Sequence, residues 1–382
     1  MTPCTEQDAM WIAVLQRTWS VARKESLHIQ RDSQTLFFML FVPVVEMFML
    51  GYANDMNVRN VRTAVLDQAG TQESRRLLQQ FESSNVARIV EVVSTEADLT
   101  ESIVDGRARL GIKIPADYSR RLEGGETAQF LVLVDGSIAS VAAEGVNIGN
   151  ALALRESLLR VLGERPLPIE ARPRVLFNPD TRSANFFIPG LLVVLCQLMA
   201  TQLSATSIVR EKEQGTLEQL FMTPVRRLEL IVGKLLPYLG AIMLEFCGIT
   251  VLMVVVFRVP IHGDFLTLLT IMFPFVLIML GTGLWISTLA ETKEAAGQMM
   301  MATILPSIFL SGYVLPYDSM PAFFRGVGKL IPTTWMIDAS RGVILRGAGW
   351  RELWPHYVIL WTMAIVVVTA STLRMRKRIG GG

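Results

Sequence analysis

The sequence has few cysteines and few histidines, and both shortages exclude whole classes of site. The 382 residues contain three of each: Cys4, Cys196, Cys247, His28, His262 and His356. Two of the cysteines stand in apolar runs, and the polar stretch 56–180 has none, so no disulfide framework is available. The histidines are far apart and no Cys/His cluster has metal-ligand spacing, so we expect no metal site.

The sequence also lacks the G-x-x-x-x-G-K-[ST] pattern that cradles nucleotide phosphates. Gly326-Val327-Gly328-Lys329 has neither the leading glycine nor the hydroxyl residue. No Ser/His, paired-Asp or H-E-x-x-H constellation stands in the apolar runs. We therefore expect no catalytic residues and no cofactor bound by this chain, so energy for any work must come from a separate protein.

Charged residues are scarce, at 18% of the chain, whereas hydrophobic residues make up 51%. This composition is too apolar for an ordinary soluble protein and predicts a polytopic protein of the lipid bilayer. The formal net charge is only +2, and no nucleic-acid partner is expected.

Six apolar segments are long enough to cross roughly 30 Å of hydrocarbon. The expected spans are 35–53, 184–207, 229–257, 265–289, 296–315 and 353–373. An even number of spans places both termini on one side of the membrane. Three basic groups fall on that side: Arg17, Arg23, Lys24 and Arg31; Arg210, Lys212, Arg226 and Arg227; Arg374, Arg376, Lys377 and Arg378. The positive-inside rule makes that side cytoplasmic, although the long outer loop before the last span is also basic.

The expected fold class is an all-α transmembrane domain of six helices with an inserted extracytoplasmic α/β domain. Its parts are a cytoplasmic amphipathic N-terminal helix (1–34), the first transmembrane helix (35–55), the α/β domain (56–180), five transmembrane helices (181–373) and a basic cytoplasmic tail (374–382). The N-terminal helix carries Trp11 and Trp19 on one side, which suits the membrane interface, and an ordinary cytosolic helix is the alternative.

Residues 56–180 alternate β-rich and helical runs, which predicts one mixed sheet covered by helices. Strands are expected at 61–66, 87–93, 109–114 and 129–134, and helices at 72–81, 95–105, 116–122 and 137–162. Asp67, Asp105 and Asp135 stand near strand ends, where a structural capping role is expected. The function predicted for this domain is therefore contact with other molecules.

A charged segment between the second and third spans has an unusually well-specified pattern. It reads Arg210-Glu211-Lys212-Glu213-Gln214-Gly215-Thr216-Leu217-Glu218-Gln219-Leu220-Phe221, followed by Thr223-Pro224. Thr216 and Gln219 have the spacing of a capping box, and Gly215 permits a sharp turn before it. Leu217, Leu220 and Phe221 share one helix face. Residues 208–224 are thus predicted to form a short amphipathic helix on a membrane face.

This segment, continued by Glu229, Gly233 and Lys234, resembles the cytoplasmic coupling loop of type-2 ATP-binding-cassette (ABC) exporter permeases. Residues 185–190 are similar to the entry motif of that family, and 312–350 to its outer re-entrant region. The motif residues are Pro189, Gly190, Gly312, Pro316, Pro321 and Pro332. The large domain between the first two spans resembles the layout of bacterial multidrug-efflux permeases.

The resemblance implies a permease subunit of an ABC exporter in a bacterial inner membrane, moving a lipophilic or drug-like substrate outward. ATP and Mg would bind a separate ABC ATPase subunit on the cytoplasmic side. A second permease, either a homodimer partner or a paralogue, would complete the pathway, and a periplasmic adaptor protein is left open. The residues implied in ATPase coupling are Arg210, Glu211, Glu213, Gly215, Thr216, Leu217, Glu218, Leu220, Phe221 and Pro224.

Two carboxylates, Glu46 and Glu245, stand inside expected spans. Ionisable groups in hydrocarbon are costly and usually face a bundle interior. One hypothesis is that they line a path for a cationic or amphipathic substrate; the other is that each is protonated and hydrogen-bonds a neighbouring helix. A proton-driven carrier that uses both residues, and a membrane-anchored display or receptor protein, are the alternatives to the permease.

Overall fold

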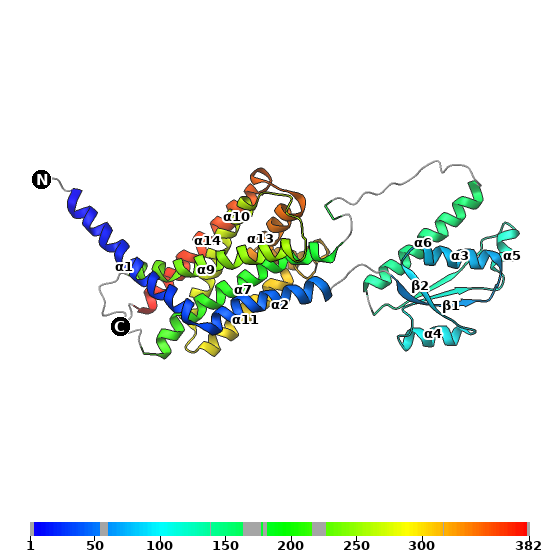
Figure 1. Ribbon diagram of the computed structural model, residues 1–382, viewed down its shortest axis with the longest axis horizontal. Helices are drawn as coiled ribbons and strands as arrows, with labels where there is room; N and C mark the ends of the chain where they lie inside the picture. The colour runs from blue at the N-terminus through cyan, green and yellow to red at the C-terminus, as the bar shows by residue number, and fades with distance from the viewer. Residues whose placement is uncertain are drawn as a thin grey trace. The chain divides into compact units, whose positions relative to one another are not determined.

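The computed structural model describes residues 4–53, 60–137, 139–162, 177–178, 182–215, 227–315 and 317–379. The chain forms two compact units (Figure 1). One unit combines Met1–Asn54 with Leu176–Gly382, and the other is Asp55–Val175.

The first unit is helical. Its long helices are α1 (Cys4–Arg31), α2 (Ser33–Ala53), α7 (Ser183–Glu213), α9 (Arg227–Val255), α10 (Phe265–Leu289), α11 (Lys293–Leu310) and α14 (Trp350–Ile379). Between α11 and α14 the chain forms the shorter elements η1 (Tyr317–Ser319), α12 (Ala322–Gly328), α13 (Pro332–Arg341) and the π-helical turn η2 (Gly342–Arg346).

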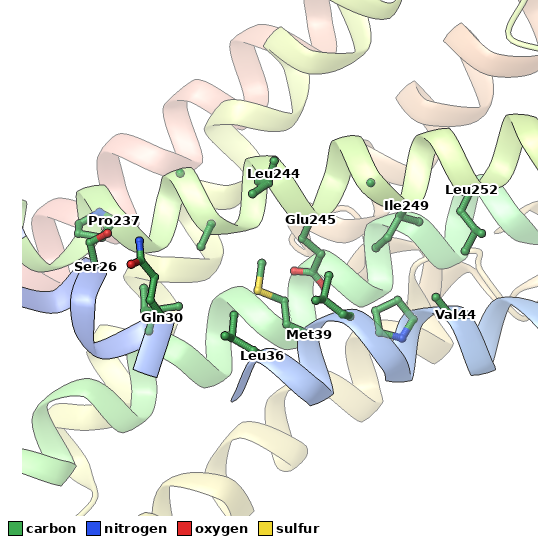
Figure 2. A pocket seen from close by; sticks show the side chains of 16 residues that line it. Ser26, Gln30, Leu36, Met39, Val44, Pro237, Leu244, Glu245, Ile249 and Leu252 are labelled. Atoms are coloured by element: carbon green, nitrogen blue, oxygen red, sulfur yellow. The ribbon is translucent and has the colours of Figure 1, made fainter. Parts of the chain in front are cut away.

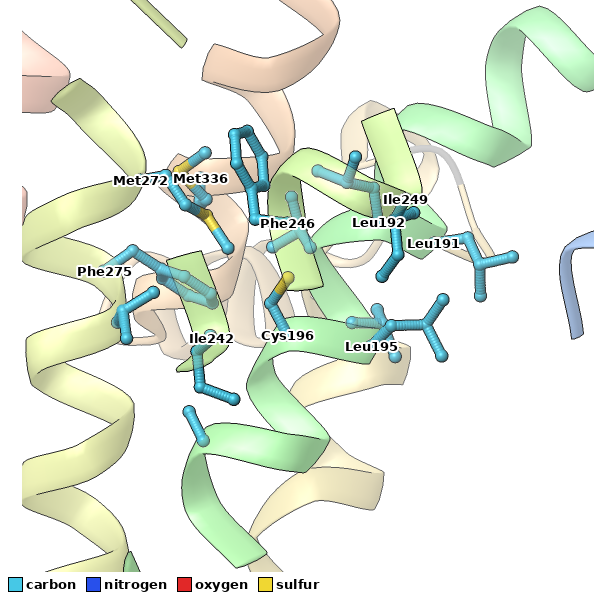
Figure 3. Close-up of a cluster of buried hydrophobic side chains, with 14 of the residues drawn as sticks. Leu191, Leu192, Leu195, Cys196, Ile242, Phe246, Ile249, Met272, Phe275 and Met336 are labelled. Carbon is cyan, nitrogen blue, oxygen red and sulfur yellow. The ribbon is translucent and has the colours of Figure 1, made fainter. Parts of the chain in front are cut away.

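Helix α7 is the central helix of this unit, because α2, α9, α10, α11 and α13 all contact it. In the most apolar 18-residue stretch of α7, 83% is buried inside the structure, whereas in the corresponding stretch of α14 only 17% is buried. The core beside it contains Leu191 and Cys196 of α7, Phe246 of α9 and Phe275 of α10 (Figure 3). Helices in a bilayer are held together by close van der Waals packing, so the contact between these side chains fixes how the three helices pack.

Among the described residues, four helices are long and apolar enough to cross a membrane: α7, α9, α10 and α14. A fifth span is possible if Val14–Arg31 and Leu36–Met49, bent by 59° at their break, count as one. The expected span at 296–315 is the helix α11, which has 18 residues and carries Lys293 and Glu294 in its first turn. Because α11 does not meet the same test of length and composition, the count of six spans is not confirmed and stays a prediction.

The second unit is an α/β unit with one four-stranded sheet. Its strands are β1 (Val61–Asp67), β2 (Ala87–Val92), β3 (Leu110–Ile114) and β4 (Leu131–Val134), and its helices are α3 (Gln72–Ser83), α4 (Glu96–Val104), α5 (Tyr118–Glu123) and α6 (Ala139–Leu162). The strand order is β2-β1-β3-β4, with β1 parallel to both neighbours and β4 antiparallel to β3. The predicted mixed sheet is confirmed, and the extracytoplasmic location stays a prediction.

Two of the strand-end aspartates in this unit shape turns. Asp67 accepts hydrogen bonds from the backbone N–H groups of Ala69 at 3.1 Å and Gly70 at 3.0 Å. Asp135 accepts from the Ser137 N–H at 3.0 Å and from the Arg109 guanidinium. Hydrogen bonds from Ser137 and Arg109 lower the pKa of Asp135 to about 2. The structural role predicted for Asp67 and Asp135 is confirmed.

Candidate coupling site

Helix α7 continues past its apolar stretch through Arg210–Glu213. The first part of the predicted segment 208–224 is therefore the end of a long helix and not the start of a separate one. Gly215 follows with φ +68°, the left-handed conformation that commonly ends a helix at a glycine. Residues from Thr216 to Pro224 lie outside the described residues, so the amphipathic coupling helix and its capping box stay predictions.

Glu211 is buried near this helix end and meets lysines from two other helices. Lys234 of α9 donates to its carboxylate at 2.9 Å, and Lys24 of α1 donates at 3.2 Å. Lys234 also donates to Glu25 of α1 at 3.0 Å, and the Tyr238 hydroxyl donates to the same carboxylate at 2.8 Å. We call these five residues the charge cluster. It joins α1, α7 and α9 where α7 ends.

A glycine on α9 lets α1 approach closely enough to form the charge cluster. A Cβ on Gly233 would lie 2.8 Å from the Val21 Cβ and 2.9 Å from the Thr18 carbonyl oxygen. One turn earlier, Glu229 pairs with Arg17 of α1 at 3.2 Å. Positions 229 and 233 lie on one helix face. Sequence positions that resembled the family pattern therefore hold the contact between α1 and α9.

The last turn of α7 is also held by α10 and α11. Lys212 donates to the carbonyl oxygens of Ser287 at 2.9 Å and Ala290 at 3.0 Å, at the C-terminal end of α10. Glu213 accepts from the Lys293 backbone N–H at 2.9 Å, at the start of α11. Carbonyl groups at a helix C-terminus attract cations and N–H groups at an N-terminus attract carboxylates, so both side chains complement the ends they reach.

The opposite end of α7 contacts the short helices before α14. A Cβ on Gly190 would lie 2.7 Å from Cδ2 of Tyr313. Arg341 of α13 donates to the carbonyl oxygens of Gly312 at 3.0 Å and Phe186 at 3.3 Å. Its guanidinium carbon is 3.9 Å from the centre of the Phe186 ring, a cation–π contact. Gly312 itself has φ +81°, which favours glycine.

The predicted motif prolines occupy helix starts and one helix interior. The Ser340 hydroxyl donates to the carbonyl oxygen of Pro189 within α7 at 3.2 Å. Pro321 precedes α12 and Pro332 is the first residue of α13, where a missing N–H costs little. Pro316 lies outside the described residues. The region 312–350 is thus a series of short helices, and its re-entrant path stays a prediction.

Substituting Gly190 tests the packing at this end. Gly190→Ala is expected to destabilise the helical unit by about 1–3 kcal/mol, because the added methyl forces Tyr313 to move within a packed core. Gly297→Ala in α11 is the matched control, since a Cβ there meets nothing within 4 Å. Thermal unfolding in detergent should show a lower Tm for the first variant alone. Equal Tm values would contradict the close contact.

A pocket of about 610 Å³ opens between α9 and the pair α1 and α2 (Figure 2). Glu245 of α9 lines it and is 4% exposed. Neither of its carboxylate oxygens has a hydrogen-bond partner among the described residues. Glu46 of α2 is half-buried and is not among the described residues that line the pocket. Of the two carboxylates that the sequence grouped together, Glu245 therefore lines this pocket and Glu46 does not.

Comparison with known proteins assigns the family. The family model described as ABC-2 family transporter protein matches residues 34–373. The chain belongs to the ABC-2 transporter family. Among its relatives in Escherichia coli (strain K12) is the probable multidrug ABC transporter permease YbhS, 28% identical over 370 residues that cover 95% of this chain and 97% of YbhS. YbhR, described in the same words, is 26% identical over 352 residues, covering 91% and 95%. The inner membrane transport permease YhhJ is 24% identical over 374 residues, covering 96% and 98%.

The match confirms the resemblance to type-2 ABC permeases, and the chain is an ABC transporter permease subunit and a multi-pass membrane protein. Of the residues assigned to coupling, Glu211 and Glu213 are engaged inside the permease. Arg210 is half-buried and lines a second pocket with Asp32. The others beyond Gly215 lie outside the described residues: Thr216, Leu217, Glu218, Leu220, Phe221 and Pro224.

Sequence reasoning missed the contribution of α1. Leu15 and Trp19 are exposed on that helix, at 67% and 66%, which suits the expected interfacial surface. The other face buries Glu25, which the pattern of apolar residues left without a role. The sequence signal that could have identified Glu25 is that it is a carboxylate among basic residues, directly after Lys24. Its partner Lys234 is too distant in sequence for any local pattern to join them.

Proposed function

We propose that this permease couples ATP hydrolysis on a separate ABC ATPase subunit to the outward movement of a lipophilic or drug-like substrate. The observation that carries the proposal is the anchoring of the end of α7. Buried charges and helix-end contacts join it to α1, α9, α10 and α11. Breaking a buried ion pair costs about 3–5 kcal/mol, so these contacts hold while the end of α7 moves. A force on the loop after Gly215 therefore moves α7 and the helices joined to it as one body.

In this proposal the ATPase docks on the cytoplasmic loop that follows Gly215, and ATP and Mg²⁺ bind to the ATPase. A second permease, a copy or a paralogue, completes the pathway in the inner membrane. Both termini are cytoplasmic, and the unit Asp55–Val175 lies on the outer side, where it contacts substrate or an adaptor protein. The printed descriptions of YbhR and YbhS as probable multidrug permeases support the substrate class.

Transport by the assembled complex tests this function. The permease, purified with its ATPase and placed in proteoliposomes, should move a lipophilic dye only when hydrolysable ATP is present. Dissipating the proton gradient should leave the rate unchanged. Transport that continues without ATP and stops when the gradient collapses would instead establish a proton-driven carrier.

A further inference from the structure

We propose that the pocket between α9 and the pair α1 and α2 binds a lipophilic organic cation, with Glu245 as its counter-ion. The inference rests on the proposed function in one respect: it names the substrate class that an exporter of this structure would take. The binding site itself is defined by the geometry of the helical unit alone.

The pocket places one carboxyl group among apolar walls. Figure 2 shows the Glu245 carboxylate directed from α9 toward α2, beside Met39. Leu36 of α2 and Ile249 and Leu252 of α9 add further apolar surface. No lysine, arginine or histidine is among the described residues that line the pocket. The Glu245 carboxylate thus has neither a hydrogen-bond partner among the described residues nor a cationic side chain beside it in the pocket wall.

This combination selects for a cation with an apolar body. An anion would be repelled, and a neutral ligand would leave the buried carboxylate unsatisfied. The apolar walls favour ligand groups that cannot form hydrogen bonds. The volume of about 610 Å³ lies within the range of roughly 300–1,000 Å³ that holds drug-sized molecules.

Two glycines of α9 keep the pocket open. Gly240 and Gly248 line it, and a Cβ on either would meet no atom within 4 Å. A larger side chain at either position would therefore occupy space without displacing backbone. Leucine is also a better helix former than glycine, so such a variant keeps α9 intact.

The test is equilibrium binding to the full-length permease in lipid nanodiscs, using tetraphenylphosphonium and tetraphenylsilane, its uncharged analogue of the same shape. The unaltered permease should bind the cation more tightly than the neutral compound. Glu245→Gln should weaken binding of the cation about tenfold and leave the neutral compound unaffected, because it removes charge while keeping shape. Gly248→Leu should weaken binding of both compounds by filling the pocket.

Gly297→Leu in α11 is the matched control, because Gly297 has equally open surroundings and does not line the pocket. It should bind both compounds normally. Unchanged cation binding in Glu245→Gln, or equal binding by Gly248→Leu and Gly297→Leu, would overturn the proposal. So would a tightly retained phospholipid with no measurable cation binding. The assay needs neither ATP nor an ATPase, so its failure is distinct from a failure of ATP-driven export.

Discussion

Replacing Lys234 by methionine is expected to destabilise the helical unit by about 3–5 kcal/mol, the usual cost of breaking a buried ion pair. Lys234 is 4% exposed and is the buried cation shared by Glu25 and Glu211, at 3.0 Å and 2.9 Å. Methionine keeps the length of the side chain but removes its charge, so the two buried carboxylates lose the buried cation that they share. A strongly lowered Tm and loss of ATP-driven transport should follow.

Lys24→Met is the matched control for this variant. Lys24 pairs with the same Glu211 carboxylate at 3.2 Å, but its side chain is 60% exposed. Exposed ion pairs contribute about 0–1 kcal/mol, so this variant should melt close to the unaltered permease. Converting Glu25 and Glu211 to glutamine in the Lys234→Met background should restore part of the lost stability, because positions 25, 211 and 234 then carry no buried charge. Similar Tm values for Lys234→Met and Lys24→Met would contradict the role given to the charge cluster.

Replacing Gly215 by proline is expected to abolish ATP-driven transport while the protein still inserts into the membrane. Gly215 has φ +68°, and a proline ring holds φ near −65°. The chain would therefore leave α7 in another direction and carry the coupling loop away from its docking position. Transport in proteoliposomes, compared with the amount of permease in the membrane, measures the effect.

Gly215→Asn is the control for the backbone conformation. Asparagine visits the left-handed region more readily than other residues with a side chain, so most transport should remain. Asparagine can adopt a positive φ and keeps the backbone N–H that Gly215 donates to the Lys212 carbonyl oxygen at 3.2 Å, whereas proline does neither, so asparagine should be tolerated where proline is not. Normal transport by Gly215→Pro would show that the direction of the chain after α7 is unimportant.

Sequence patterns correctly predicted the helices and strands that are determined by the composition and periodicity of the segment itself. The apolar run at 265–289 became α10 with the same bounds, because its length and composition alone favour a helix capped by Asp264. The alternation of strands and helices likewise predicted the mixed sheet. The helix expected at 296–315 lies earlier in the chain, since α11 spans Lys293–Leu310 and the chain then turns at Gly312.

The candidate sites depended on contacts that no local pattern contains. Glu25 and Lys234 are separated by 209 positions, and only the close approach of α1 to Gly233 brings them together. Glu245 was identified because a charge is unusual in an apolar run. Its pocket was not predictable, because it depends on how α2 and α9 pack around the space beside Gly248.

Recovery of an ABC ATPase with the tagged permease, from native membranes in a gentle detergent, tests the central claim most directly. Mass spectrometry should identify an ABC ATPase with the unaltered permease and with Gly215→Asn. It should be depleted with Gly215→Pro, although the permease itself is present at the same level. An ATPase recovered equally with all three would contradict docking at this loop, and the absence of any ATPase would contradict the proposed coupling altogether.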